Sequence, residues 1–267
     1  MSVLKAKRHL AKSEFEHTFS LFYIESERLI NKVPKRRKKY VTENIAVINN
    51  SIYNDLMVIQ KYLFAKKDNK KEIKKLRILS VLEKIDFLEK AIMVYSNIMS
   101  MSFEQQCNWV SYLDKEVALL NGMLDEETPK SKFKATVLDW EKISRFEVLR
   151  NMVCLHRYTH GKAVRAVGKF ETCTTPLLIG IIDDALFYLS KANSYIPQTK
   201  AEYEEREKYI DIVLQKLDEI QRPMLMYFST MGYSNRVQRE WSEMLRKEIK
   251  LVKGLQNSDR KRFSKLS

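Results

Sequence analysis

Two histidines, His156 and His160, have the spacing that comes closest to a chemical motif in this sequence. On a helix, residues i and i+4 share one face, and zinc sites use this histidine spacing. The glutamate that a metalloprotease places after the first histidine is absent, because Arg-Tyr-Thr separates the pair. The nearest third ligand, Cys154, falls on a different helix face. We therefore expect solvated or partner-facing histidines, with no metal and no cofactor.

Two Lys-Glu pairs, Lys115-Glu116 and Lys247-Glu248, could support acid–base chemistry only beside a second acid or a base. Nothing else polar recurs beside them except serine and glutamine at the start of their helices. An interhelical salt bridge or a capping contact is therefore the favoured interpretation. The sequence also has no phosphate-binding glycine loop, nucleophile elbow, HExxH or paired CxxC. We expect that the chain is not an enzyme.

A run of cations directly after Val33-Pro34 is the strongest candidate for a binding surface. With 48 Lys and Arg against 34 Asp and Glu, the formal net charge is +14. Such an excess attracts polyanions over a long range. Whether this run shares a face with a second Lys-rich group depends on the packing. We predict phosphate binding by Lys32, Lys35, Arg36, Arg37, Lys38 and Lys39, helped by Lys66, Lys67, Lys70, Lys71, Lys74, Lys75 and Arg77.

The composition favours helices over sheets, because Gly (6) and Pro (5) are scarce. A hydrophobic content of 45% is enough for a core. Three scattered cysteines, Cys107, Cys154 and Cys173, argue against a disulfide framework and for a reducing cytoplasm. No apolar run approaches the roughly 18 residues of a membrane span, and the N-terminus has no apolar signal core. Neither a span nor a secretion signal is expected.

The sequence contains one stretch twice, at a constant offset of 132 residues between 102–122 and 234–254. Upstream the match is weaker and the offset slips to 130. We interpret this as a tandem duplication, with both tryptophans as core anchors and Gly122 as a left-handed helix cap. Ser102 is expected to cap the helix that follows it, with Gln105 completing a capping box. The repeated residues are Trp109, Leu113, Lys115, Glu116 and Gly122, matched by Trp241, Leu245, Lys247, Glu248 and Gly254.

The spacing of apolar residues predicts four helices in each copy. Short joints between long helices favour antiparallel up-and-down bundles. The predicted fold class is therefore all-α, with two tandem antiparallel up-and-down four-helix bundles. The helices are predicted over about 13–32, 36–66, 71–99 and 102–122, and again over about 142–162, 174–196, 200–230 and 234–254. The predicted domains are 1–125, with a loose basic arm over 1–12, a linker over 126–141, a second bundle over 142–256 and a basic tail over 257–267.

The stretch VPKRRKKY (Val33 to Tyr40), the Lys-rich turn and EVALLNG (ending at Gly122) resemble the Avd four-helix-bundle family. These are the accessory variability determinants of diversity-generating retroelements, and bundle proteins encoded in ribosomal-RNA intervening sequences share the pattern. The second copy, with KANSYIP and KEIKLVKGLQNSDRKRF, is similar to longer phage-type relatives. The resemblance implies a basic bundle that binds nucleic acid, partners a reverse transcriptase and forms a homo-oligomeric ring. Two copies in one chain, and no Pro-basic run at Val164–Lys169, depart from the family pattern.

The leading functional prediction is a non-catalytic, cytoplasmic accessory protein that binds structured RNA or an RNA–DNA hybrid. It would serve a reverse transcriptase of a retroelement, phage or other mobile element. The alternative is a protein-interaction scaffold without nucleic-acid binding. That scaffold would use the faces carrying Met99, Met101 and Phe103, or Met224, Met226 and Phe228. A metal-dependent enzyme built on the two histidines is a third, disfavoured hypothesis.

Overall fold

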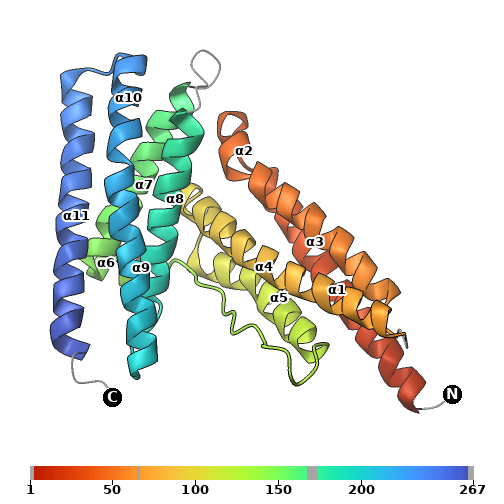
Figure 1. Cartoon of the computed structure of the whole chain (residues 1–267). Coiled ribbons are helices and arrows are strands. Elements are labelled where there is room, and N and C mark those ends of the chain that lie inside the picture. The colour runs from red at the N-terminus through yellow and green to blue at the C-terminus, as the bar shows by residue number, and fades with distance from the viewer. Residues whose placement is uncertain (1–2, 65–66, 167–173, 264–267) are drawn as a thin grey trace. The chain divides into compact units, whose positions relative to one another are not determined.

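The computed structural model describes residues 3–64, 67–166 and 174–263, and every regular element within them is helical (Figure 1). The side chains of residues 3–13, 15, 16 and 166 lie outside the described part. The all-α class predicted from the sequence is confirmed. None of the described helices combines the length and the apolar character needed to cross a membrane.

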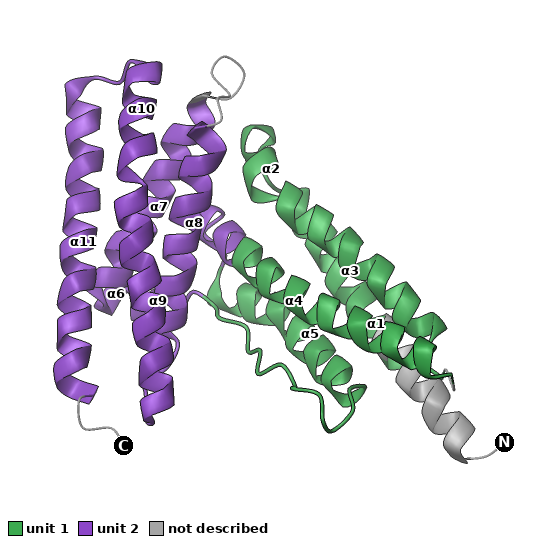
Figure 2. Ribbon diagram, viewed as in Figure 1, with its two compact units in different colours: residues 1–92, 102–137 green, residues 93–101, 138–267 purple. Residues whose placement is uncertain are grey.

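The chain divides into two compact units (Figure 2). Unit 1 consists of residues 1–92 and 102–137, and unit 2 consists of residues 93–101 and 138–267. The division therefore differs from the predicted domain boundaries at residues 93–101, which pack with the second half of the chain. These residues supply a polar side chain to the candidate site described below.

Unit 1 contains four whole helices and most of a fifth. α1 packs on both α3 and α5, and α2 packs on α3. In its core, Phe22 stacks on Trp109 with 6.3 Å between the ring centroids. The predicted capping box is confirmed, because Ser102 and Gln105 exchange two hydrogen bonds of 3.2 Å at the start of α5. The bounds are α1 (Val3–Ile30), α2 (Lys35–Val41), α3 (Glu43–Lys61), α4 (Asp68–Ile98) and α5 (Phe103–Gly122).

The non-helical segment after α5 is held against unit 1 by side chains that bind its backbone. Asn121 donates to the Ser131 carbonyl at 2.8 Å and accepts from the Ser131 N–H at 2.9 Å. The Thr136 N–H donates to Glu89 on α4 at 2.6 Å. The segment predicted as a linker is thus attached to α4 and α5 over much of its length.

Unit 2 contains the remaining helices and the C-terminal turns of α4. α7 packs on α8, α8 on α9, α9 on α11 and α11 on α7, so these four helices surround one core. Tyr227 and Phe228 meet Trp241 edge to face in that core. The bounds are α6 (Trp140–Arg145), α7 (Glu147–Ala163), the 3-10 turn η1 (Val164–Ala166), α8 (Thr174–Asn193), α9 (Lys200–Glu219), α10 (Gln221–Met231) and α11 (Asn235–Phe263).

The internal repeat appears in the structure as equivalent contacts within each unit. The Trp109 indole N–H donates to Ser26 Oγ at 3.0 Å, and that of Trp241 donates to Thr159 Oγ1 at 3.1 Å. Both indoles have 0% of their surface exposed. Leu113 and Leu245, one turn later, are also buried. The matched tryptophans therefore join α5 to α1 and α11 to α7 in the same way.

Several predicted helix boundaries are wrong. The helix expected over 36–66 is divided at Thr42, where both Oγ1 and the backbone N–H donate to the Lys38 carbonyl, at 2.7 and 2.9 Å. The helix expected over 200–230 is divided at Ile220, three residues before Pro223, which has no N–H to donate. The helix expected over 142–162 is likewise divided, at Phe146.

The expectations for the chain ends and the glycines also need correction. Residues 3–12, expected as a loose arm, belong to α1, and 257–263, expected as a tail, continue α11. The extension of α11 is held to α9, where buried Arg206 binds Asp259 at 2.7 Å. Gly122 ends α5 without a left-handed conformation, and Gly254 lies inside α11. The left-handed glycine cap in the described residues is instead Gly232, with φ of 58°, after α10.

Candidate functional site

The first predicted cation group lies at the corner between α1 and α2, which we call the α1–α2 basic segment (Lys32, Lys35, Arg36, Arg37, Lys38 and Lys39). α1 ends at Ile30, and Pro34 precedes the first residue of α2. The next side chains, Tyr40 and Val41, are buried and attach α2 to the core of unit 1. This attachment turns the preceding cations outward.

The α1–α2 basic segment is strongly exposed to solvent. Five of its cations are exposed, and Arg37 is half-buried. The Lys39 ammonium lies 5.8 Å from the centre of the Tyr40 ring, at the limit of a cation–π contact. Within the described part of the chain, no acidic side chain forms an ion pair with Lys32, Lys35 or Arg36. The positive charge of these side chains is therefore available to an outside anion.

The second predicted cation group, at the start of α4, is less uniform. Lys67, Lys70 and Lys71 are exposed, and Lys71 binds Asp68 at 3.0 Å. Lys74 and Lys75 are half-buried, and Lys66 lies outside the described residues. This group therefore presents fewer open cations than the sequence suggested.

Arg77, the last member of the second group, takes part in a structural ion pair. Its guanidinium binds Asp55 of α3 at 2.7 Å, and Lys84 and Ser80 bind the same carboxylate. Partial burial alone would raise the pKa of Asp55, but Lys84 and Arg77 outweigh it and hold that pKa below its usual value. Arg77 thus joins α3 to α4, and its contact with phosphate stays a prediction.

The two cation groups lie at opposite ends of α3. α2 directly precedes this helix, and the second group follows its C-terminal end. A helix of 19 residues is about 28 Å long. That distance is shorter than one turn of duplex DNA, about 34 Å. One nucleic-acid helix could reach both groups only by lying along α3.

The Lys-Glu pairs separate into two roles. The lysines form the predicted interhelical salt bridges, Lys115 to Glu14 at 3.1 Å and Lys247 to Glu147 at 2.9 Å. The adjacent glutamates point into the core, where Glu116 and Glu248 are fully buried. Burial raises the pKa of both carboxyls to about 8. Each carboxyl therefore keeps its proton at neutral pH.

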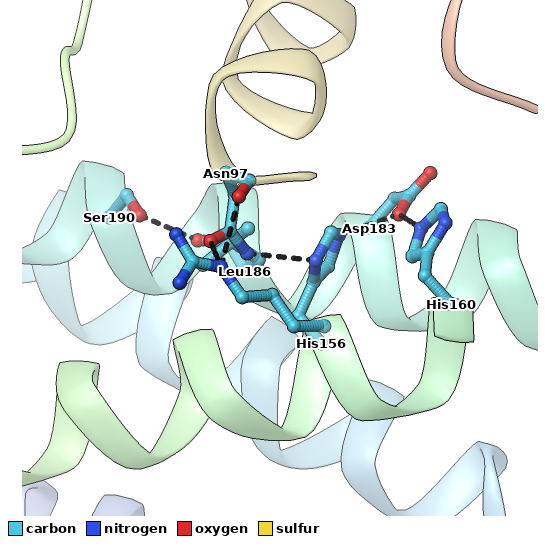
Figure 3. A network of polar contacts seen from close by, with 7 residues as sticks. Asn97, His156, His160, Asp183, Leu186 and Ser190 are labelled. Carbon is cyan, nitrogen blue, oxygen red and sulfur yellow. Dashed lines mark hydrogen bonds and ion pairs between the residues drawn. The ribbon is translucent and has the colours of Figure 1, made fainter. Parts of the chain in front are cut away.

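The histidine pair lies inside unit 2, and the expectation that these histidines are solvated is wrong. His156 has 0% and His160 has 2% of its surface exposed. Both rings approach Asp183 of α8, whose Oδ1 lies 2.8 Å from His156 Nε2 and 2.7 Å from His160 Nε2 (Figure 3). Cys154, considered as a third ligand, is exposed instead. We call His156, His160 and Asp183 the His–Asp cluster.

The hydrogen bonds around His156 determine its tautomer. Arg157 Nε can only donate, and it lies 2.7 Å from the Asn97 side-chain oxygen and 2.9 Å from the Asn97 carbonyl. The Asn97 amide nitrogen therefore faces His156 Nδ1, at 2.9 Å, and donates to it. The proton of His156 must then be on Nε2, directed at Asp183 (Figure 3).

The charge states within the His–Asp cluster follow from this arrangement. Burial and the nearby His160 lower the pKa of His156 to about 4, although Asp183 acts in the opposite direction. Burial alone would raise the pKa of Asp183, but the two histidines reverse this and hold it at about 2. At neutral pH the cluster therefore contains a buried carboxylate that accepts from a neutral His156.

The described residues of unit 1 contain no such cluster. Ser26 and Thr159, which both accept from a repeated tryptophan, are 133 residues apart, and the same offset aligns Tyr23 with His156. The offset of 130 aligns Tyr53 with Asp183. Tyr23 and Tyr53 are ring neighbours, 6.3 Å apart, on α1 and α3. The equivalent positions in unit 1 thus carry two aromatic rings, of which Tyr53 is 47% exposed, and the helical arrangement does not require a buried polar cluster there.

The sequence contained one signal for the missing third member of the cluster. Asp183 and Asp184 interrupt the otherwise apolar run Leu177–Leu189 in the middle of α8. A carboxylate within a buried helix face needs a partner.

The comparisons with known proteins add no function, because no protein-family model, curated protein or solved structure matches the chain.

Proposed function

We propose that this chain is a non-catalytic nucleic-acid-binding protein that contacts phosphates through the α1–α2 basic segment. The supporting observation is the group of five exposed cations, Lys32, Lys35, Arg36, Lys38 and Lys39, within eight residues at one corner of unit 1. Lys and Arg that neutralise phosphates release bound counterions, which supplies affinity without sequence specificity. The net charge of +14 adds long-range attraction.

The proposed ligand is structured RNA or an RNA–DNA hybrid, and the proposed partner is a reverse transcriptase of a mobile element. The similarity of the Val33–Tyr40 stretch to Avd bundles favours this partner. The same proposal includes two tandem four-helix bundles, which the repeated Trp contacts and the closed circuit of α7, α8, α9 and α11 support. Cytoplasmic location and self-association belong to the proposal as well.

Binding should depend on the segment and not on net charge alone. Replacing Lys32, Lys35, Arg36, Lys38 and Lys39 with glutamine keeps helix propensity and removes five charges. We expect the slope of log K against log salt to fall by about 4 to 5, since each phosphate contact contributes about 0.9 on duplex DNA. The measurement is fluorescence anisotropy with an RNA hairpin, an RNA–DNA hybrid and duplex DNA, over a salt series.

A charge-matched variant tests whether binding depends only on the net charge of the protein. Lys200, Lys208, Arg236, Lys250 and Lys253 are exposed cations of unit 2, and their replacement by glutamine removes the same charge. This variant should keep nearly the full salt slope. Equal losses in both variants would assign binding to net charge, and no binding at low salt by the unmodified protein would reject the proposal.

The scaffold hypothesis receives less support, because its proposed faces are partly core. Met101, Met224 and Phe228 are buried. Of the remaining side chains, Phe103 and Met226 are exposed. Only part of each predicted face is therefore accessible to a protein partner.

A further inference from the structure

We propose that the His–Asp cluster of unit 2 is a binding site for one divalent transition-metal ion, with Zn²⁺ as the best-suited ion. Its ligands would be His156 Nε2, His160 Nε2 and a carboxylate oxygen of Asp183. The three candidate ligand atoms lie within 4.8 Å of one another. Two imidazoles and one carboxylate are a ligand set that Zn²⁺ and related ions accept.

The helices place these ligands without help from loops. His156 and His160 are one turn apart on α7 and face the same way, and Asp183 comes from the adjacent α8. Zinc bonds of about 2.0–2.1 Å in a tetrahedron separate ligand atoms by about 3.3 Å. The present nitrogen-to-oxygen distances are 2.8 and 2.7 Å. Each contact would have to open by only about half an ångström to admit the ion.

Charge favours a cation at this place. The Asp183 carboxylate is buried, and in the described structure the groups that face it from α7 are imidazoles and not a lysine or arginine. Arg157, the nearest guanidinium in the network, is directed at Asn97. A buried carboxylate without a full countercharge is costly, and a divalent ion would supply that countercharge.

Metal binding would require His156 to change tautomer. Its Nε2 must present a lone pair to the ion, so its single proton moves to Nδ1, and the histidine stays neutral. His160 Nε2 also faces the Asp183 carboxylate, so it must likewise present a lone pair, with its proton on Nδ1. The Asn97 amide then turns, because its oxygen must accept from Nδ1. Arg157 Nε keeps the Asn97 backbone carbonyl as its acceptor, at 2.9 Å. Asn97 and Arg157 would thus be the outer partners that orient a ligating histidine.

The comparison with unit 1 indicates that the helical arrangement does not by itself require the cluster, because unit 1 carries Tyr23 and Tyr53 at the equivalent positions. In unit 2, His160 Nδ1 is a buried nitrogen with no hydrogen-bond partner in the described structure. Hydrogen bonds within the protein therefore do not fully satisfy the ring of His160.

The test is metal titration of the full-length protein, first stripped with a chelator. We expect one Zn²⁺ per chain by elemental analysis after gel filtration, a visible absorption spectrum on adding Co²⁺, and its loss when Zn²⁺ displaces Co²⁺. Asp183→Asn and His160→Gln should each lower affinity at least tenfold. The matched controls are His17→Gln and Cys154→Ser, which change exposed side chains and should bind as the unmodified protein does.

A second measurement decides the question even if the cluster variants fail to fold. Nitrogen-15 chemical shifts report which ring nitrogen of a histidine carries the proton. In the unmodified protein, Zn²⁺ should convert His156 from the Nε2–H to the Nδ1–H form. Unchanged shifts at saturating Zn²⁺, or Co²⁺ bound equally by Asp183→Asn and the unmodified protein, would overturn the proposal.

Discussion

Replacing Glu116 or Glu248 with glutamine is expected to stabilise the protein above pH 8 and to remove part of its loss of stability between about pH 4.5 and 8. Both side chains are fully buried in α5 and α11. Glu248 accepts from Asn151 at 2.6 Å, which favours the charged carboxylate, but burial outweighs this. Glutamine keeps the shape of the side chain and carries no charge at any pH.

The sign follows from the protons bound in each state. The folded chain holds each carboxyl proton up to about pH 8, whereas the unfolded chain releases it near 4.5. The folded state therefore gains stability that is complete below pH 4.5 and is lost as the pH rises to about 8. The loss is about 1.4 kcal/mol per pH unit for each carboxyl, on the order of 5 kcal/mol across the interval.

The measurement is urea unfolding at several pH values between 5 and 9. Burial lowers the pKa of His156 from 6.5 to about 4, so this histidine makes the folding stability rise as the pH increases from about 4 to 6.5. In that pH range its effect is opposite to the effect of the two glutamates. The difference between each variant and the unmodified protein isolates the carboxyl, most clearly above pH 6.5. Glu83→Gln and Glu243→Gln are exposed controls and should leave the pH dependence unchanged. Parallel curves for Glu116→Gln and the unmodified protein would contradict a buried, protonated carboxyl.

Replacing either repeated tryptophan with alanine is expected to cost about 3–5 kcal/mol of folding free energy. Trp109 and Trp241 are fully buried, and each removes a large aromatic surface from water. Alanine would also leave the hydroxyl of Ser26 or Thr159 without its indole donor. The measurement is chemical unfolding followed by far-ultraviolet circular dichroism, with the two single variants compared.

Two further substitutions separate the ring from its hydrogen bond. Trp241→Phe keeps an aromatic ring against Tyr227 and Phe228 and removes the donor, so it should cost less than Trp241→Ala. Trp140→Ala is a control, because that ring is only half-buried although its N–H donates to the Met101 carbonyl at 2.7 Å. If Trp140→Ala lowers the folding free energy as much as Trp109→Ala and Trp241→Ala do, the repeated tryptophans do not contribute more to stability than a half-buried tryptophan.

Local sequence patterns correctly predicted the helical class, the capping box at Ser102 and the burial of the two repeated tryptophans. These features depend on the spacing of residues along a single helix, and they do not depend on which other helices pack against it. Helix ends were less accurate. The break between α2 and α3 falls at Thr42, which the spacing of apolar residues does not mark, and the continuation of α11 is held to α9 by the pairing of Arg206 with Asp259.

Which polar residues meet, and which are buried, depends on how the helices pack. Lys115 and Glu116 are neighbours in the sequence, yet one reaches Glu14 at the surface and the other enters the core. His156 and His160 acquired Asp183 as a partner because α7 packs on α8. Periodicity assigns residues to faces of a helix, but contacts between helices distant in the chain depend on how those faces pack. The chemistry of this protein therefore had to be read from the folded chain.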